Sequence, residues 1–186
     1  TMLVECHPHA DPASWLLENP GFVSGGNLRW WRDQFAPLER AAEARGEGDA
    51  YDLLAHDAED IPPGADGVVY LPCMQGAMAP EWDGAARGVF CGLTLAHTRA
   101  HMTRALLEGS AFALRDVLAA MQAAGLEVHR LTIVGGGAKG ALWRQIKADV
   151  TGVPVRVPTN VETTATGAAI LAAVAAGIHP TVPDAV

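Results

Sequence analysis

Apolar residues recur along the chain with two periods, one typical of strands and one typical of helices. Strands are predicted by short apolar or β-branched runs at 2–7, 15–23, 67–72, 88–93, 130–135 and 153–157, the first two forming a hairpin or meander. Helices are predicted by three- and four-residue apolar steps at 24–44, 50–61, 96–124, 141–151 and 163–176. Early strands followed by strand–helix alternation predict an α/β domain in which helices flank a mixed β-sheet.

The predicted helix 96–124 contains a glycine, Gly109, inside its apolar stripe. Glycine within a helix costs about 1 kcal/mol relative to alanine, so we expect another group to approach that backbone closely. A packed neighbour and a bound ligand explain it equally well, and Ala113 continues the same groove one turn later. Gly125, Gly152 and Gly177 each follow a predicted helix and are expected to end it.

Composition excludes several partners. The chain has 186 residues, 49% of them hydrophobic, and a net charge of -8, so we expect a water-soluble domain that binds neither nucleic acid nor an anionic membrane. Its longest apolar run, 165–178, is shorter than the roughly 20 residues of a membrane span. Three scattered cysteines predict a reducing, cytoplasmic location without disulfides. The strand-like first residues lack a leader, and we expect them to continue a longer protein.

Three consecutive glycines, Gly135, Gly136 and Gly137, join a predicted strand to a predicted helix. Such a turn can cradle a phosphate, receive a flat ring or simply make a tight corner. The segment is neither a Walker A loop nor a GxGxxG dinucleotide motif. The glycines alone therefore leave these alternatives open.

Other polar clusters suggest structural roles. His97 and His101 have the spacing of two metal ligands on a helix, but no acidic ligand completes the site, so we expect solvated or capping histidines and no metal. Asp83 and Arg87 lie in the long connection 73–87, where we expect a buried ion pair rather than a catalytic role. No serine lies in a GxSxG elbow.

Three segments carry a family resemblance: 88–116 (GVFCGLTLAHTRAHMTRALLEGSAFALRD), 134–155 (VGGGAKGALWRQIKADVTGVPV) and 162–177 (ETTATGAAILAAVAAG). They resemble the C-terminal domain of the FGGY carbohydrate kinases, most closely xylulokinases. The spacing from Gly88 through Phe90, Gly92 and Leu93 to His101-Met102 and Ala105–Glu108 agrees with that family's second signature.

The resemblance implies an α/β, ribonuclease H-like fold of the actin, Hsp70 and hexokinase superfamily. Residues 1–186 would be part of the C-terminal, ATP-binding domain. The N-terminal sugar-binding domain, with the catalytic Asp and the first phosphate loop, would be absent. We therefore expect this chain by itself to be inactive, to pair with its own N-terminal domain, and to be compatible with a homodimer.

The same resemblance assigns the ligands. ATP with Mg²⁺ and a sugar would be bound, and the glycine turn would receive the adenosine and α-phosphate through Gly135, Gly136, Gly137, Ala138 and Ala141. Gly109 and Ala113 match helix positions that face adenine in related kinases. No catalytic residue and no metal ligand is expected within this chain.

The expected substrate is a ketopentose such as D-xylulose. At 76–80 the chain reads GAMAP where xylulokinases commonly read GERTP, and at 162–165 ETTA resembles glycerol kinases. A kinase for ribulose or glycerol and a non-catalytic actin-like binding domain are the alternatives.

Overall fold

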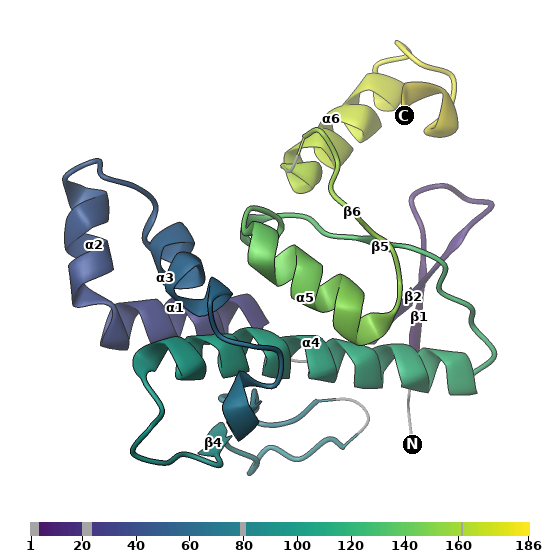
Figure 1. Ribbon diagram of the computed structural model, residues 1–186. Coiled ribbons are helices and arrows are strands. Elements are labelled where there is room, and N and C mark those ends of the chain that lie inside the picture. The colour runs from purple at the N-terminus through teal and green to yellow at the C-terminus, as the bar shows by residue number, and fades with distance from the viewer. Residues whose placement is uncertain (1–3, 20–23, 79–80, 161) are drawn as a thin grey trace.

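The computed structural model describes residues 4–19, 24–78, 81–160 and 162–186, and one long helix, α4, crosses its centre (Figure 1). Its strands are β1 (Glu5–Pro8), β2 (Trp15–Glu18), β3 (Val69–Leu71), β4 (Val89–Cys91), β5 (Leu131–Thr132) and β6 (Val155–Arg156). Its helices are α1 (Ser24–Phe35), α2 (Pro37–Ala44), α3 (Ala50–Glu59), α4 (Arg99–Ala123), α5 (Ala141–Thr151) and α6 (Thr163–Ala175), with 3-10 turns η1 (Ala65–Gly67), η2 (Gly136–Ala138) and η3 (Pro183–Ala185). The predicted strand ends at 2–3 and 20–23, and residues 79 and 80 of the predicted loop, lie outside the described residues.

The described strands form three two-stranded sheets. β1 and β2 are antiparallel, as are β3 and β4, whereas β5 and β6 are parallel. The predicted hairpin and the mixture of parallel and antiparallel pairing are therefore present. The strands are only two to four residues long, shorter than the apolar runs that predicted them, and within the described chain the pairs remain separate.

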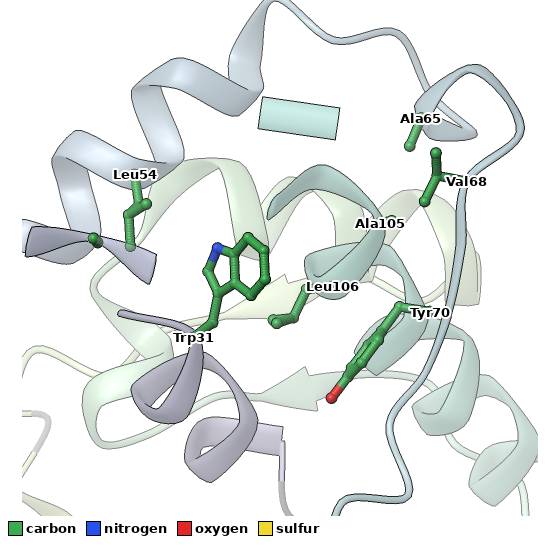
Figure 2. Close-up of a cluster of buried hydrophobic side chains, with 8 residues drawn as sticks. Trp31, Leu54, Ala65, Val68, Tyr70, Ala105 and Leu106 are labelled. Carbon is green, nitrogen blue, oxygen red and sulfur yellow. The ribbon is translucent and has the colours of Figure 1, made fainter. Parts of the chain in front are cut away.

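Helix α4 is the centre of the core. One of its faces packs Ala105 and Leu106 against Trp31 of α1 and Tyr70 of β3 (Figure 2). Another face packs Leu107 and Ala111 against Trp143 and Ile146 of α5. Because α4 is buried on both faces, it holds α5 and the turn before α5 in a fixed position relative to α1.

The predicted helix 24–44 is wrong as a single element. The chain leaves helical geometry at Ala36, where φ is -124°, and α2 starts at Pro37. Proline has no N–H to continue the hydrogen bonds of α1, but its fixed φ suits the first position of a new helix. Leu38 is consequently 75% exposed, so the apolar stripe of α1 stops at this break.

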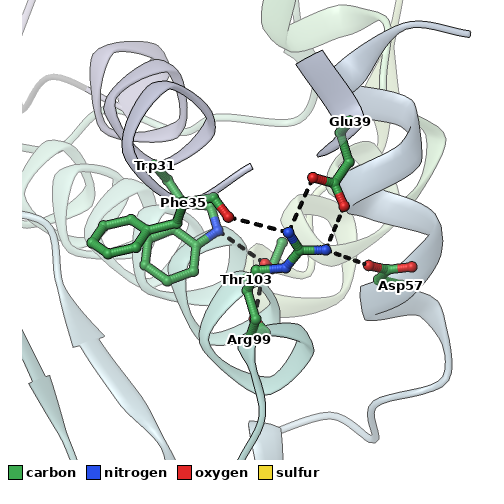
Figure 3. Close-up of polar contacts among 6 residues, drawn as sticks. All are labelled: Trp31, Phe35, Glu39, Asp57, Arg99 and Thr103. Atoms are coloured by element: carbon green, nitrogen blue, oxygen red, sulfur yellow. Dashed lines mark hydrogen bonds and ion pairs between the residues drawn. The ribbon is translucent and has the colours of Figure 1, made fainter. Parts of the chain in front are cut away.

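Arg99, at the start of α4, connects this helix to α1, α2 and α3 (Figure 3). Its guanidinium donates to the Phe35 carbonyl at 3.1 Å, to both carboxylate oxygens of Glu39 in α2, and to Asp57 Oδ2 in α3 at 3.0 Å. Nearby, Trp31 Nε1 donates to Thr103 Oγ1 at 3.0 Å. These contacts fix α1, α2 and α3 against the first turns of α4.

The predicted glycine ends of three helices and the capping role of His101 are confirmed. Gly125, Gly152 and Gly177 all have positive φ at helix C-termini. His101 takes part in the capping box of α4, because its Nδ1 accepts from the Thr98 N–H at 3.1 Å. Glycine and polar caps thus satisfy backbone groups that a helix end leaves unpaired.

The predicted buried ion pair in the long connection is wrong. Both Asp83 and Arg87 are exposed. Asp83 Oδ1 accepts from the Ala85 N–H at 2.8 Å, and Arg87 Nη1 donates to the carbonyls of Gly84 and Ala86. Each charge caps its own loop backbone, which is enough to hold a tight turn without burying either one.

Helix α6 lies apart from the core, near the C-terminus in Figure 1. It contains no buried residue, although its sequence, TTATGAAILAAVA, is almost entirely apolar or small. Among the described helices, none combines the length and apolar character that crossing a membrane requires.

Candidate functional site

The glycine turn, Gly135 to Gly140, joins β5 to α5. Its first three glycines differ in whether the structure requires glycine at their positions. Gly135 has φ 68° and ψ -158°, which essentially only glycine adopts. A Cβ added to Gly136 would have no atom within 4 Å, and one added to Gly137 would make ordinary contacts with Lys147 Nζ at 3.6 Å and Trp143 at 3.7 Å. The backbone therefore demands glycine only at the first position, and the next two leave main chain bare.

The polar groups of this turn are divided between two sides. Arg144 of α5 donates from Nη1 to the carbonyls of Ala138 and Lys139. The Gly136 and Gly137 amides, by contrast, donate to no acceptor in the described part of the chain. Because α5 begins at Ala141, directly after the turn, its unpaired N–H groups and its dipole add positive potential. This arrangement favours an anion.

A cleft of about 310 Å³ opens beside the turn. Helices α1, α3 and α4 supply its other walls. The residues around it are Gly25, Leu28, Arg29, Asp49, Tyr51, Asp52, Leu54, Ala55, Thr103, Leu107, Gly136, Gly137, Lys139, Gly140 and Trp143. Its volume is at the small end of the range for ligand pockets, and its wall combines aliphatic and aromatic side chains with a few charges, as such pockets do.

The structure brings two of the seven predicted site residues, Gly136 and Gly137, to the cleft wall. Gly135 and Ala141 are exposed neighbours outside that wall, and Ala138 is buried beneath the turn. The turn is thus open to a ligand on the side of Gly136 and Gly137.

The two predicted positions on α4, Gly109 and Ala113, do not line the cleft. A Cβ on Gly109 would lie 2.2 Å from the Tyr70 carbonyl oxygen, so β3 lies directly on that part of the helix. Of the two explanations that the sequence left open, close packing accounts for this glycine. Thr103 and Leu107, on another face of α4, line the cleft instead.

The charges around the cleft are mixed. Arg29 and Lys139 contribute cations, while Asp49 and Asp52 of the α3 N-terminal turn contribute carboxylates. Asp49 is partly committed, because its Oδ1 accepts from the Tyr51 N–H at 2.8 Å as the N-cap of α3. An occupant with an anionic end at the glycine turn and hydrogen-bond donors at the α3 end would match this distribution.

Lys147 lies behind the glycine turn. It is only 7% exposed, and its Nζ sits 3.8 Å from the centre of the Trp143 ring. Burial lowers the pKa of Lys147 to about 8. Trp143 is itself held by a hydrogen bond from its Nε1 to the Leu107 carbonyl at 3.2 Å, so ring and ammonium form a fixed floor under the turn.

Sequence reasoning missed the α1 and α3 walls of the cleft. One signal was present: Gly25 and Gly26 occupy the first turn of a predicted amphipathic helix, where glycine is unfavourable unless the backbone must stay bare. Nothing in local spacing indicated that α3 would come opposite residues 136–137, since more than 75 positions separate them.

Comparison with known proteins defines the class. The model of the FGGY family of carbohydrate kinases, C-terminal domain, matches residues 4–176. A solved xylulose kinase from Rhodospirillum rubrum is 32% identical with a TM-score of 0.82, over 100% of this chain and 36% of that one. A glycerol kinase from Plasmodium falciparum, solved with ADP, is 27% identical with a TM-score of 0.70, over 91% of this chain and 31% of that one. The fold is thus of the actin and hexokinase type, as the sequence predicted.

The chain belongs to the FGGY family of carbohydrate kinases. Among curated relatives, the gluconokinase of Bacillus subtilis is 38% identical over 164 residues, which are 88% of this chain and 32% of that protein. The chain spans about a third of the length of the relatives it matches. Relatives named for xylulose, glycerol and gluconate are all similar to it. The comparisons therefore show the family and do not distinguish between these substrates.

Proposed function

We propose that this chain is the nucleotide-binding part of an ATP-dependent carbohydrate kinase. The observation that carries the proposal is the cleft beside bare main chain at Gly136 and Gly137, with unpaired amides and the N-terminus of α5 next to it. ADP in the solved glycerol kinase from Plasmodium falciparum supports a nucleotide as the occupant.

We place the nucleotide's phosphate end at the glycine turn and its base between α1 and α3. The amides of Gly136 and Gly137 would donate to a phosphate oxygen, and Gly135 would hold the turn in shape. Ala138 and Ala141 would support the turn from its flanks. Contact between adenine and Gly109 or Ala113 stays a prediction that the position of the cleft does not support.

Phosphoryl transfer itself would need groups from outside this chain. In the described residues, no group of three His, Cys, Asp or Glu could hold a metal ion, so we assign no Mg²⁺ ligand here, and magnesium would arrive on the nucleotide's phosphates. The proton-accepting Asp and most of the sugar pocket would belong to an N-terminal domain of the same protein. Because transfer depends on positioning and charge neutralisation at the γ-phosphate, this chain alone would be inactive.

The proposed acceptor is a ketopentose, D-xylulose first. The likeness to the Rhodospirillum rubrum xylulose kinase over the whole chain supports it. Gluconate, glycerol and ribulose are the competing acceptors.

A cytoplasmic location, supported by three free cysteines, and a homodimer complete the proposal.

Calorimetry with ADP and ATP tests the nucleotide assignment. We expect saturable binding by the chain, and loss of that binding in Gly136→Leu, whose side chain would enter the open space beside the turn. Gly167→Leu in α6 is the matched control, because its Cβ also meets no atom within 4 Å but lies outside the cleft. Absence of binding by the unsubstituted chain would instead favour a non-catalytic actin-like domain.

A sugar panel tests the acceptor. The full-length protein should phosphorylate D-xylulose with a larger kcat/KM than ribulose, glycerol or gluconate, while the 186-residue chain should turn over none of them. Preference for another sugar would overturn the xylulose assignment and leave the kinase intact. Turnover by the chain alone, in the usual range of about 1–100 per second, would contradict the need for a second domain.

A further inference from the structure

Lys147 is the one cation in the described core that has neither a carboxylate partner nor a hydrogen bond to backbone. The other buried cation, Arg104, pairs with Glu108 at 2.6 Å. Within the part of the chain that the structure describes, the ammonium of Lys147 instead stacks on the ring of Trp143. No carboxylate of the described residues neutralises this cation, so an anion bound next to it would meet an uncompensated positive charge.

The ammonium is directed at the glycine turn. Lys147 comes from the second turn of α5, and its Nζ lies 3.6 Å from the point where a Cβ on Gly137 would be. Its other neighbour, Trp143, forms part of the cleft wall. Gly137 lines the cleft and Lys147 does not, so the charge of Lys147 reaches the cleft across the turn.

We propose that Lys147 is a positioning residue that supplies the buried counter-charge for the anionic phosphate group of a nucleotide at Gly136 and Gly137. This inference rests on the proposed nucleotide site. The ammonium acts through the turn, adding to the potential of the free amides and of the α5 N-terminus at the same point. It discriminates between charged and uncharged ligands and leaves recognition of the base to α1 and α3.

The burial of Lys147 decides how strong this effect should be. Lys139 also borders the cleft but is exposed, so water and salt screen its charge. A charge held under the turn is screened much less, so we expect its removal to weaken the binding of an anionic ligand by roughly tenfold.

The experiment compares ADP with adenosine by calorimetry on the unsubstituted chain, Lys147→Met and Lys147→Arg. Methionine keeps an unbranched apolar stem of similar length and removes the charge. We expect Lys147→Met to weaken ADP binding by roughly tenfold and to leave adenosine binding within about twofold. Lys147→Arg should restore most of the ADP affinity. Arg130→Met, which removes an exposed charge outside the cleft wall, should change neither ligand.

Each other outcome counts against the inference. Equal losses for ADP and adenosine would mean that Lys147 only supports Trp143 and the turn. Unchanged ADP binding in Lys147→Met would overturn the counter-charge while leaving the nucleotide site in place. If the unsubstituted chain binds neither ligand, the proposed function fails and this inference fails with it. Circular dichroism and thermal unfolding of each variant separate misfolding from a binding defect. If Lys147→Met does not fold, Lys147→Gln, which also removes the charge, repeats the comparison of ADP with adenosine.

Discussion

Gly109 and Gly136 are both glycines at predicted site positions, and the structure gives them opposite surroundings. Gly109 is pressed against the backbone of β3, whereas Gly136 faces open space beside the cleft. The sequence marks both positions as unusual, because glycine is disfavoured in a helix and three in a row leave a stretch of backbone without side chains. It does not show whether protein or ligand fills the place of the missing side chain, since that depends on what folds against it.

The close packing at Gly109 predicts a large stability effect. Gly109→Ala would put a Cβ 2.2 Å from the Tyr70 carbonyl oxygen, and relief would require β3 to move. We expect a loss of about 2–3 kcal/mol in the free energy of unfolding, measured by urea denaturation. Gly167→Ala, also inside a helix but with open space around it, should raise stability by up to about 1 kcal/mol. Equal effects of the two substitutions would show that Tyr70 does not press on α4.

The lowered pKa of Lys147 predicts that the free energy of unfolding rises with pH. Its pKa falls from 10.5 in the unfolded chain to about 8 when folded. Between these values the unfolded chain binds more protons, so the free energy of unfolding increases from pH 8 towards 10.5 and gains about 3 kcal/mol in total. Lys147→Met should therefore be more stable than the parent chain at pH 7, and the difference should shrink by pH 9.5. Urea denaturation of both proteins at the two pH values measures it, and groups common to both, such as Tyr70 and Cys73, cancel.

At the scale of elements, the sequence predicted the C-terminal ends of the helices better than their starts. The 141–151 prediction agrees with α5, and the 96–124 prediction agrees with the C-terminal end of α4, because a glycine with positive φ follows each helix. Helix α4 begins at Arg99, three residues later than predicted, because Thr98 is its N-cap. The 24–44 prediction failed because an apolar period was followed through Pro37, where the missing N–H and the burial of Ala36 turn the chain. Strand lengths were overestimated because pairing, which local sequence does not contain, sets where a strand ends.

The Arg99 contacts predict how firmly α2 and α3 are attached. Burial raises and hydrogen bonding to Arg99 lowers the pKa of Glu39, with a net downward shift, so this carboxylate is charged at neutral pH. Arg99→Met would leave the Glu39 side chain, 11% exposed, without its partner. We expect a loss of about 2 kcal/mol in chemical denaturation. Arg40→Met breaks a 3.9 Å contact with Asp33 between more exposed groups and should cost under about 0.5 kcal/mol.

At the scale of the whole molecule, α6 has more apolar surface than its own contacts cover. No residue of this helix is buried, and Leu171 is 47% exposed. We therefore predict that the isolated chain associates at micromolar concentration and that Leu171→Lys reduces the association, as measured by analytical ultracentrifugation. The substitution should shift Tm by less than about 2 °C, because no native core contact is lost. A strictly monomeric parent chain would show that this surface does not drive association.

The sequence by itself determined the order of the elements, the glycines that end three helices and the place of the glycine turn at 135–137. These properties depend on glycine geometry and on hydrophobic period, which act over a few positions, whereas the family was indicated by motifs that resemble those of known kinases. Only the tertiary structure decided that α1 and α3 face the glycine turn, that Gly109 packs against β3, and that a lysine stacked on Trp143 lies beneath Gly137. Those facts arise because α4 buries two faces at once and so brings together segments that are far apart in the chain.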